Sequence, residues 1–178
     1  DDTLLEDLLS EKGHNCRLHI RLETNEAIDN AFEIANWSQR IDALFFGGVD
    51  MSAELRCENK WEPLLYARSR IVHAAASAGI DAIDVPYLDL DNLDGMKEEA
   101  IKANELGFSG KGSIHPKQIS VLNDVFTPSI EVIERAKKIT STFEEANTGL
   151  VVIDGKLIEK PVLREMYRIL SIANKLNN

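Results

Sequence analysis

Two carboxylates, Glu23 and Asp50, stand at the ends of apolar stretches that have the character of consecutive β-strands. If those strands are adjacent and parallel, their axes lie about 4.8 Å apart, so both carboxylates reach one edge of the sheet. Two carboxylates that close repel each other unless a proton or a cation lies between them. Magnesium commonly takes one or two protein carboxylates together with water and substrate oxygens. The pair therefore suggests a magnesium site, and helix-capping or surface roles are the alternative.

Further polar residues stand at similar junctions. Asp84 ends the third apolar stretch, where it would serve a ligand or act as a structural carboxylate. His115 precedes a proline and is a candidate base or a structural hydrogen-bonding residue. Glu159 follows a predicted hairpin, as an acid–base group or a solvated charge. Gly47 and Gly48 remove side-chain bulk before Asp50, so a ligand could approach the backbone there.

Short apolar strands alternate with amphipathic helices along the chain. The periodicity predicts strands at 17–23, 41–46, 80–85 and 108–114 and helices at 24–35, 59–78, 93–106, 116–125 and 129–143. A hairpin at 149–158, turning at Asp154-Gly155, and a helix beginning at Pro161 follow. Repeated strand–helix units indicate an α/β fold with a parallel sheet, either half of a (β/α)₈ barrel or a small doubly wound sheet. In both folds the carboxyl ends of the strands carry the active site.

Composition narrows the function classes. The chain has 178 residues with 44% hydrophobic and 28% charged residues, which is typical of a soluble globular domain. A net charge of −10 argues against a nucleic-acid partner, and we expect no membrane span because no apolar run reaches about 18 residues. Two unpatterned cysteines favour reduced thiols and a cytoplasmic location. No signal peptide is recognisable, although a missing start before Asp1 could have carried one.

The glycine-rich stretch 107–113 imitates a phosphate-binding loop. A P-loop needs four residues between its glycines and Ser or Thr directly after its lysine. Here two residues separate Gly107 from Gly110, and Gly112 follows Lys111. We therefore do not interpret this stretch as a nucleotide site.

Seven short motifs stand in order along the chain: LET at 22–24, FGGVD at 46–50, YARSR at 66–70, AID at 82–84, GFSGK at 107–111, IHPKQI at 114–119 and FTPS at 126–129. Together they resemble the citrate lyase beta subunit-like proteins of the HpcH/HpaI aldolase superfamily, which also holds malyl-CoA and citramalyl-CoA lyases. The resemblance extends from about Leu18 to the C-terminus and follows the family's order and spacing.

The resemblance implies a (β/α)₈ TIM barrel with a C-terminal helical extension. Residues 1–145 would be the C-terminal half of that barrel, strands five to eight, and residues 146–178 would be the extension. The family's extension packs on a neighbouring subunit, so we expect a homo-oligomer, a trimer or a hexamer. The first four strand–helix units are absent, so we expect a polypeptide about twice the half-barrel length, or a first half that is disordered or cleaved. We expect the 178-residue chain alone to be inactive.

The resemblance also assigns roles to matching positions. It implies Mg²⁺ as the cofactor, and its substrate-binding arginine belongs to the absent half. The matching residues are Glu23 and Asp50 for the metal; Gly47, Gly48, Val49 and Thr24 for the substrate; His115, Pro116 and Gln118 for CoA; and Asp84 and Glu159 for catalysis. The family more often has Asp at the position of Glu159, and Glu lengthens the arm by one methylene.

The implied activity is a magnesium-dependent cleavage of a carbon–carbon bond in a 2-hydroxyacyl-CoA thioester of the citryl-, malyl- or citramalyl-CoA type. The products, an acyl-CoA and a 2-oxo acid, are the expected small-molecule partners. One alternative is a non-catalytic or regulatory homologue that binds CoA esters, which the Glu159 departure motivates. Another is a metal-dependent aldolase that acts on free oxo acids.

Overall fold

A computed structural model of the chain describes residues 2–11, 15–146 and 150–176, with side chains described for 7–11, 15–146 and 150–174. The chain forms two compact units, Asp1–Leu122 and Asn123–Asn178. The predicted boundary was at 145/146. The observed boundary, between Leu122 and Asn123, lies earlier in the chain because the helix ending at Ala146 shares a hydrophobic core with the hairpin and helix that follow it.

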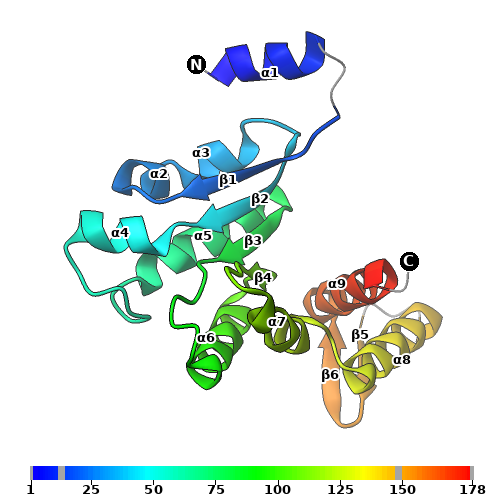
Figure 1. The fold of residues 1–178 in the computed structure, drawn as a ribbon. Helices are drawn as coiled ribbons and strands as arrows, with labels where there is room; N and C mark the ends of the chain where they lie inside the picture. The colour runs from blue at the N-terminus through cyan, green and yellow to red at the C-terminus, as the bar shows by residue number, and fades with distance from the viewer. Residues whose placement is uncertain (1, 12–14, 147–149, 177–178) are drawn as a thin grey trace. The chain divides into compact units, whose positions relative to one another are not determined.

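The first unit contains a four-stranded parallel sheet in the sequential order β1-β2-β3-β4. Its strands are β1 Leu18–Leu22, β2 Ile41–Phe46, β3 Asp81–Asp84 and β4 Gly110–Lys111. Its helices are α1 Asp2–Glu11, α2 Asn25–Asp29, α3 Ala31–Asn36, α4 Gly48–Leu55, α5 Leu65–Ala78, α6 Leu93–Leu106, the 3₁₀ turn η1 Pro116–Gln118 and α7 Ile119–Phe126, which crosses into the second unit. Helices α3 and α5 pack against each other and against β2 (Figure 1).

The predicted parallel α/β fold is confirmed. Sequential parallel order is what half of a (β/α)₈ barrel requires, while closure into a barrel stays a prediction. Buried strand side chains such as Leu22, Leu44 and Phe46 alternate with residues on the opposite face.

The observed helices differ from the predicted ones in several places. The helix predicted at 24–35 breaks at Asn30, and the Arg70 guanidinium donates to the carbonyls of Ile28 and Asp29 beside the break. Helix α5 begins only at Leu65, because the residue before a proline, here Pro63, disfavours the helical conformation. Helix α4 was not predicted, because its Gly-Gly start has the pattern of a turn.

The fourth strand is only two residues long, whereas the prediction extended over 108–114. Gly112 N still donates to Asp84 O at 2.9 Å, so the backbone follows β3 slightly further. At Ile114 the backbone N–H instead bonds to the side-chain oxygen of Gln118, which turns the chain into η1. A side chain therefore ends this strand.

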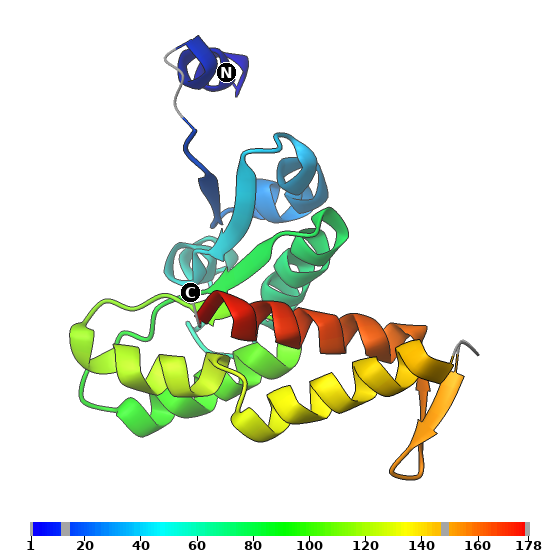
Figure 2. The same ribbon diagram turned by 90° about the vertical axis from the view of Figure 1, so that its right-hand side faces the viewer.

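The second unit is an antiparallel hairpin between two helices. It consists of α8 Ile130–Ala146, β5 Leu150–Ile153, β6 Lys156–Glu159 and α9 Lys160–Leu176. Figure 2 shows α8 and α9 side by side, with the hairpin at the end where α9 begins. Asp154 and Gly155 have φ angles of 51° and 74°, as a two-residue type I′ turn requires. The predicted hairpin is therefore confirmed from Leu150 onward, while its first predicted residue, Gly149, lies outside the described residues.

Candidate active site

The carboxyl ends of β1 and β2 meet where the sequence placed its metal ligands. Leu22 pairs with Phe46, and Gly47 N donates to Leu22 O at 2.9 Å, which sets Glu23 beside Gly47. A Cβ on residue 47 would lie 2.4 Å from the Glu23 Cβ and 2.8 Å from its Oε2. Only glycine leaves room for the Glu23 side chain in this position.

One oxygen of the Glu23 carboxylate has no hydrogen bond. Its side chain is 29% exposed, and the buried Oε2 accepts no hydrogen bond, although Arg21 Nε lies 2.7 Å away as an ion-pair partner. Arg21 Nη2 donates to Oε1 at 3.2 Å. A metal ion needs no donor hydrogen aligned on the oxygen, so an orphaned carboxylate oxygen of this kind fits a hard cation.

Asp50 lies in the first turn of α4, which begins immediately after β2. Its side chain is exposed, and the helix N-terminus favours its negative charge. Asp50 therefore follows the strand next to that of Glu23 and is accessible to a ligand. Within the described residues, no three or more His, Cys, Asp or Glu side chains form a ready metal cage. A cation at Glu23 and Asp50 would thus complete its shell with water or substrate oxygens.

The start of α4 offers backbone donors beside these carboxylates. The first N–H groups of a helix have no partner within the helix. Gly48 is buried, and a Cβ there would lie 2.9 Å from Phe46 Cε1 and 3.1 Å from Val85 Cγ1. Val49 is exposed on the surface. The predicted substrate-contacting stretch is therefore tightly packed at its glycines and accessible at Val49.

Asp84 lies in a buried charge cluster and not in an open site. It is fully buried, with Oδ1 accepting from Arg68 Nε at 2.9 Å and Oδ2 from Lys111 Nζ at 2.7 Å. Lys111 Nζ also donates to Glu99 Oε1 at 2.6 Å. Both carboxylate oxygens are occupied and shielded from ligands, so we revise the expected catalytic role of Asp84 to a positioning role.

The cluster contacts residues that lead into the Gly47-Gly48 turn beside Glu23. The Arg68 guanidinium lies between two aromatic rings, 5.0 Å from the centroid of Phe46 and 4.6 Å from that of Trp61. Phe46 immediately precedes Gly47, and Val85, which follows Asp84, packs at Gly48. The buried charges therefore position Phe46 and Val85, the two side chains that pack next to the Gly47-Gly48 turn.

Arg68 and Lys111 belong to the YARSR and GFSGK motifs, but no role was predicted for either residue. One signal was available for Arg68, which falls on the same helical stripe as the buried residues Leu64, Ile71 and Ala75. A cation in an apolar stripe indicates a buried partner of opposite charge. The sequence had no comparable signal for the identity of that partner.

Of the three expected CoA contacts, two are exposed. His115 and Pro116 lie at the surface, and His115 Nδ1 accepts from Lys117 N at 3.2 Å. Gln118 is fully buried, with Oε1 accepting from Ile114 N and Nε2 donating to Tyr87 O. Its amide is thus hydrogen-bonded to the backbone of Ile114 and Tyr87. We therefore revise the expected role of Gln118 from a CoA contact to a residue that positions this loop.

Tyr87 anchors the same loop region. Burial, reinforced by the nearby Glu99 carboxylate, raises the pKa of the Tyr87 phenol above its usual value. The phenol therefore stays protonated at neutral pH, and its oxygen accepts from Asn92 Nδ2 at 3.3 Å. It serves this loop as a neutral hydrogen-bonding group.

Thr24, an expected substrate contact, caps a helix. Its Oγ1 accepts from Ala27 N at 3.1 Å, as an N-cap of α2 should. Thr24 also lines a groove of about 580 Å³, together with Ile20, Ile34, Trp37 and others, that includes none of Glu23, Gly47 or Asp50. Thr24, the residue after Glu23, is thus accessible, but its hydroxyl oxygen already accepts the hydrogen bond that caps α2.

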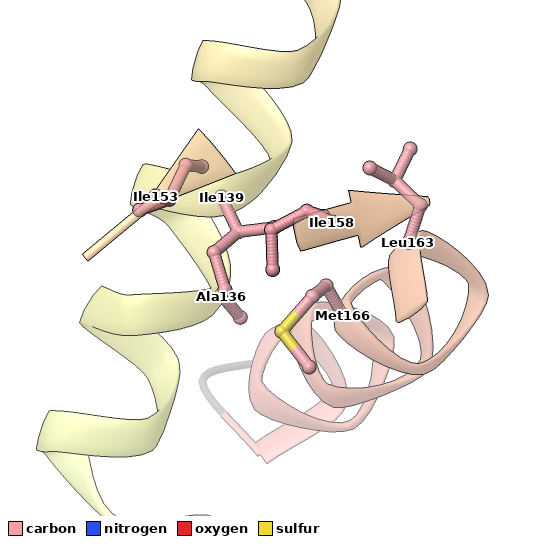
Figure 3. Packing of buried hydrophobic residues seen from close by; sticks show 6 residues of the cluster. All are labelled: Ala136, Ile139, Ile153, Ile158, Leu163 and Met166. Carbon is pink, nitrogen blue, oxygen red and sulfur yellow. The ribbon is translucent and has the colours of Figure 1, made fainter. Parts of the chain in front are cut away.

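Glu159 is the last residue of β6 in the second unit and is exposed. The hairpin has two apolar faces. One packs between the helices, where Ile153 and Ile158 contact residues of α8 and α9 (Figure 3). The other exposes Leu150, Val152 and Leu157, and Leu150 pairs directly with Glu159. The carboxylate therefore projects from an uncovered apolar surface.

Residues 8–116 match the family described as HpcH/HpaI aldolase/citrate lyase, more than half of the chain. The chain belongs to this family, as its motifs indicated. It is 36% identical over 157 residues to citrate lyase subunit beta of Escherichia coli K12, covering 85% of this chain and 52% of that protein. It is 36% identical over 141 residues to the mitochondrial citramalyl-CoA lyase of Rattus norvegicus, covering 76% of this chain and 42% of that protein.

Solved structures resemble the chain as well. The CitE protein of Mycobacterium tuberculosis, in complex with magnesium, acetoacetate and coenzyme A, matches with a TM-score of 0.73 and 27% identity over 89% of this chain and 61% of that chain. RipC of Yersinia pestis matches with a TM-score of 0.65 and 39% identity over 66% of this chain and 54% of that chain. The chain thus spans about half the length of its relatives. Among the described residues, no helix is long and apolar enough to cross a bilayer.

Proposed function

We propose that this chain forms part of a magnesium-dependent lyase that cleaves a carbon–carbon bond of a 2-hydroxyacyl-CoA thioester. The observation that carries the proposal is the Glu23 carboxylate, held against Gly47 with one buried oxygen unbonded. Asp50 at the next strand end supplies a second, accessible carboxylate. Membership of a family whose relatives are named citrate lyase and citramalyl-CoA lyase supports the reaction class.

Glu23 and Asp50 would hold the magnesium ion. When bound, the ion supplies Lewis-acid polarisation and orientation of the oxo-acid portion of the substrate. The backbone of Gly48 and Val49 at the start of α4 would bind the substrate carboxylate, since helix N-termini favour anions. The exposed residues His115 and Pro116 would contact the CoA portion.

In the proposed reaction, the bond between the hydroxyl-bearing carbon and the α-carbon of the thioester breaks. The hydroxyl proton passes to a base as the 2-oxo group forms, and the bonding electron pair moves to the thioester as an enolate. Protonation of the enolate carbon then yields the acyl-CoA. We propose the Glu159 side chain as the donor of that proton, because its hairpin surface is apolar and exposed.

We further propose that the complete protein is a (β/α)₈ barrel that assembles as a homo-oligomer, a trimer or a hexamer. The sequential parallel sheet supports the barrel, and its face opposite α5 would then be the interior. The exposed apolar face of the hairpin, formed by Leu150, Val152 and Leu157, supports docking of Glu159 onto a neighbouring subunit.

The test uses the full-length protein with Mg²⁺ and a panel of citryl-CoA, malyl-CoA and citramalyl-CoA. We expect turnover of at least one thioester, and a loss of kcat/KM of about 10²-fold or more in Asp50→Asn, because metal catalysis contributes several kcal/mol. Asp94→Asn is the matched control, since Asp94 is also an acidic residue in a helical first turn, that of α6.

The other outcomes separate the alternatives. Absence of turnover across the panel would contradict the proposal. Calorimetric binding of CoA esters without turnover, not rescued by Glu159→Asp, would instead favour a regulatory homologue. Cleavage of free hydroxy acids that is indifferent to CoA would favour an aldolase.

A further inference from the structure

Arg21 lies directly on the proposed metal ligand. Its guanidinium contacts both carboxylate oxygens of Glu23, with Nε 2.7 Å from Oε2 and Nη2 3.2 Å from Oε1. The two residues are two positions apart on an extended stretch, so their side chains share one face of the sheet. A cation of the protein therefore already occupies the carboxylate that a metal would need.

Strand register places this pair on the side of the sheet opposite the buried charges. Arg21 pairs with Phe45 and Phe45 with Ile83, so these three residues share a face. Asp84 follows Ile83 and points to the other face, where it bonds Arg68 of α5. Arg21 thus has no part in the charge cluster that stabilises the sheet against its helices.

A divalent cation can replace Arg21 as the partner of Glu23. In the described residues the Arg21 side chain is 62% exposed and that of Glu23 is 29% exposed. Both lie at the carboxyl end of β1, the end at which a parallel barrel stays open to ligands. Exposed ion pairs contribute little free energy, which a divalent cation can replace. The Nε–H is not aligned on Oε2, so that oxygen is neutralised by charge but receives no hydrogen bond.

We propose that Arg21 neutralises the Glu23 carboxylate before Mg²⁺ binds, and that Mg²⁺ displaces the guanidinium when it binds to Glu23. The released guanidinium then binds a carboxylate of the oxo-acid substrate beside Gly47, since arginine's planar fork matches a carboxylate with two hydrogen bonds. Arg21 in this way couples metal binding to substrate binding. The inference rests on the proposed magnesium site at Glu23 and Asp50.

The test measures Mg²⁺ binding by isothermal calorimetry on the full-length protein in 0.15 M salt. We expect Arg21→Gln to bind Mg²⁺ about two- to fivefold more tightly than the wild type, because the competing exposed ion pair is removed. Arg17→Gln is the matched control. Arg17 forms a similar exposed pair with Asp42 at 3.0 Å, so its removal changes the net charge equally and should leave the Mg²⁺ affinity unchanged.

A second titration adds oxaloacetate, a 2-oxo acid, to the Mg²⁺-saturated protein. Arg21→Gln should bind it about tenfold or more weakly, while Arg21→Lys, which keeps the charge but not the fork, should fall between. Unchanged or weaker Mg²⁺ binding in Arg21→Gln, equal tightening in Arg17→Gln, or unchanged oxaloacetate binding would each overturn the inference alone. Failure of the wild type to bind Mg²⁺ would overturn the proposed metal site together with it.

Discussion

The same sheet carries two sets of opposite charges that differ in burial. Asp84 is fully buried and bonds Arg68 and Lys111, while Glu23 is partly exposed and pairs with Arg21. The buried carboxylate has both oxygens hydrogen-bonded, and the exposed one keeps an oxygen without a hydrogen bond. The difference separates a charge that holds the fold from a charge that can accept a ligand.

The buried set also explains the position of the exposed one. Arg68 stacks on Phe46, and Phe46 leads into the Gly47-Gly48 turn against which Glu23 lies. A change in the cluster is therefore expected to act first on stability and then, through this turn, on Glu23, the proposed metal ligand. A change at Arg21 is expected to act on ligand binding alone.

The largest effect should come from Asp84→Asn. Removing this anion leaves Arg68 and Lys111 buried without full compensation, which should lower the free energy of unfolding by about 3–5 kcal/mol. Asp42→Asn, in a partly exposed ion pair with Arg17, should cost about 0–1 kcal/mol. Urea unfolding followed by circular dichroism measures both, and equal losses would show that burial does not decide the cost of removing a paired carboxylate.

A smaller effect is expected for Gly47→Ala. The added Cβ would collide with Glu23, which should cost about 1–3 kcal/mol of stability and displace the carboxylate, so Mg²⁺ affinity falls. Gly79→Ala is the control, since Gly79 has a φ of 72° but no atom within 4 Å of a Cβ. It should lose comparable stability through backbone strain and keep wild-type Mg²⁺ affinity. Calorimetry measures the Mg²⁺ affinity of both variants. Normal Mg²⁺ affinity in Gly47→Ala would show that Glu23 is not a ligand of the proposed metal site.

The smallest effect concerns ionic strength. Raising NaCl from 0.1 to 1 M shortens the screening length from about 10 Å to about 3 Å. The advantage of Arg21→Gln in Mg²⁺ affinity should then shrink below about twofold, because exposed pairs are screened. The stability loss of Asp84→Asn should persist, since salt does not reach a buried pair. Salt-independence of the Arg21 effect would indicate a contact that is stronger than its exposure implies.

Much of the scaffold was predictable from local patterns. The strand at 41–46 and the helix at 93–106 have the bounds that periodicity indicated, and Asp154-Gly155 turns as its residue types require. The strand-to-helix junctions correctly placed Glu23 and Asp50 after consecutive parallel strands. These features depend on neighbours in the chain, so sequence spacing was sufficient.

The partners of individual side chains were not predictable in this way. Asp84, Gln118 and Thr24 were all read as site residues, yet the first two are buried and hydrogen-bonded within the chain and the third caps a helix. Helix α4 was also missed, because two glycines weaken the helical pattern at its start. A polar residue at a strand end has the same sequence signature whether it binds a ligand or a neighbouring side chain.

Periodicity, turn chemistry and the order of motifs thus established the family, the parallel sheet and the edge at which chemistry is expected. Tertiary packing decided which of the charges at that edge are committed to the fold. The reason is that Asp84 meets Arg68 and Lys111 from 16 and 27 residues away, across elements that only folding brings together. Burial and hydrogen-bond saturation, which belong to the folded chain, distinguish that carboxylate from Glu23.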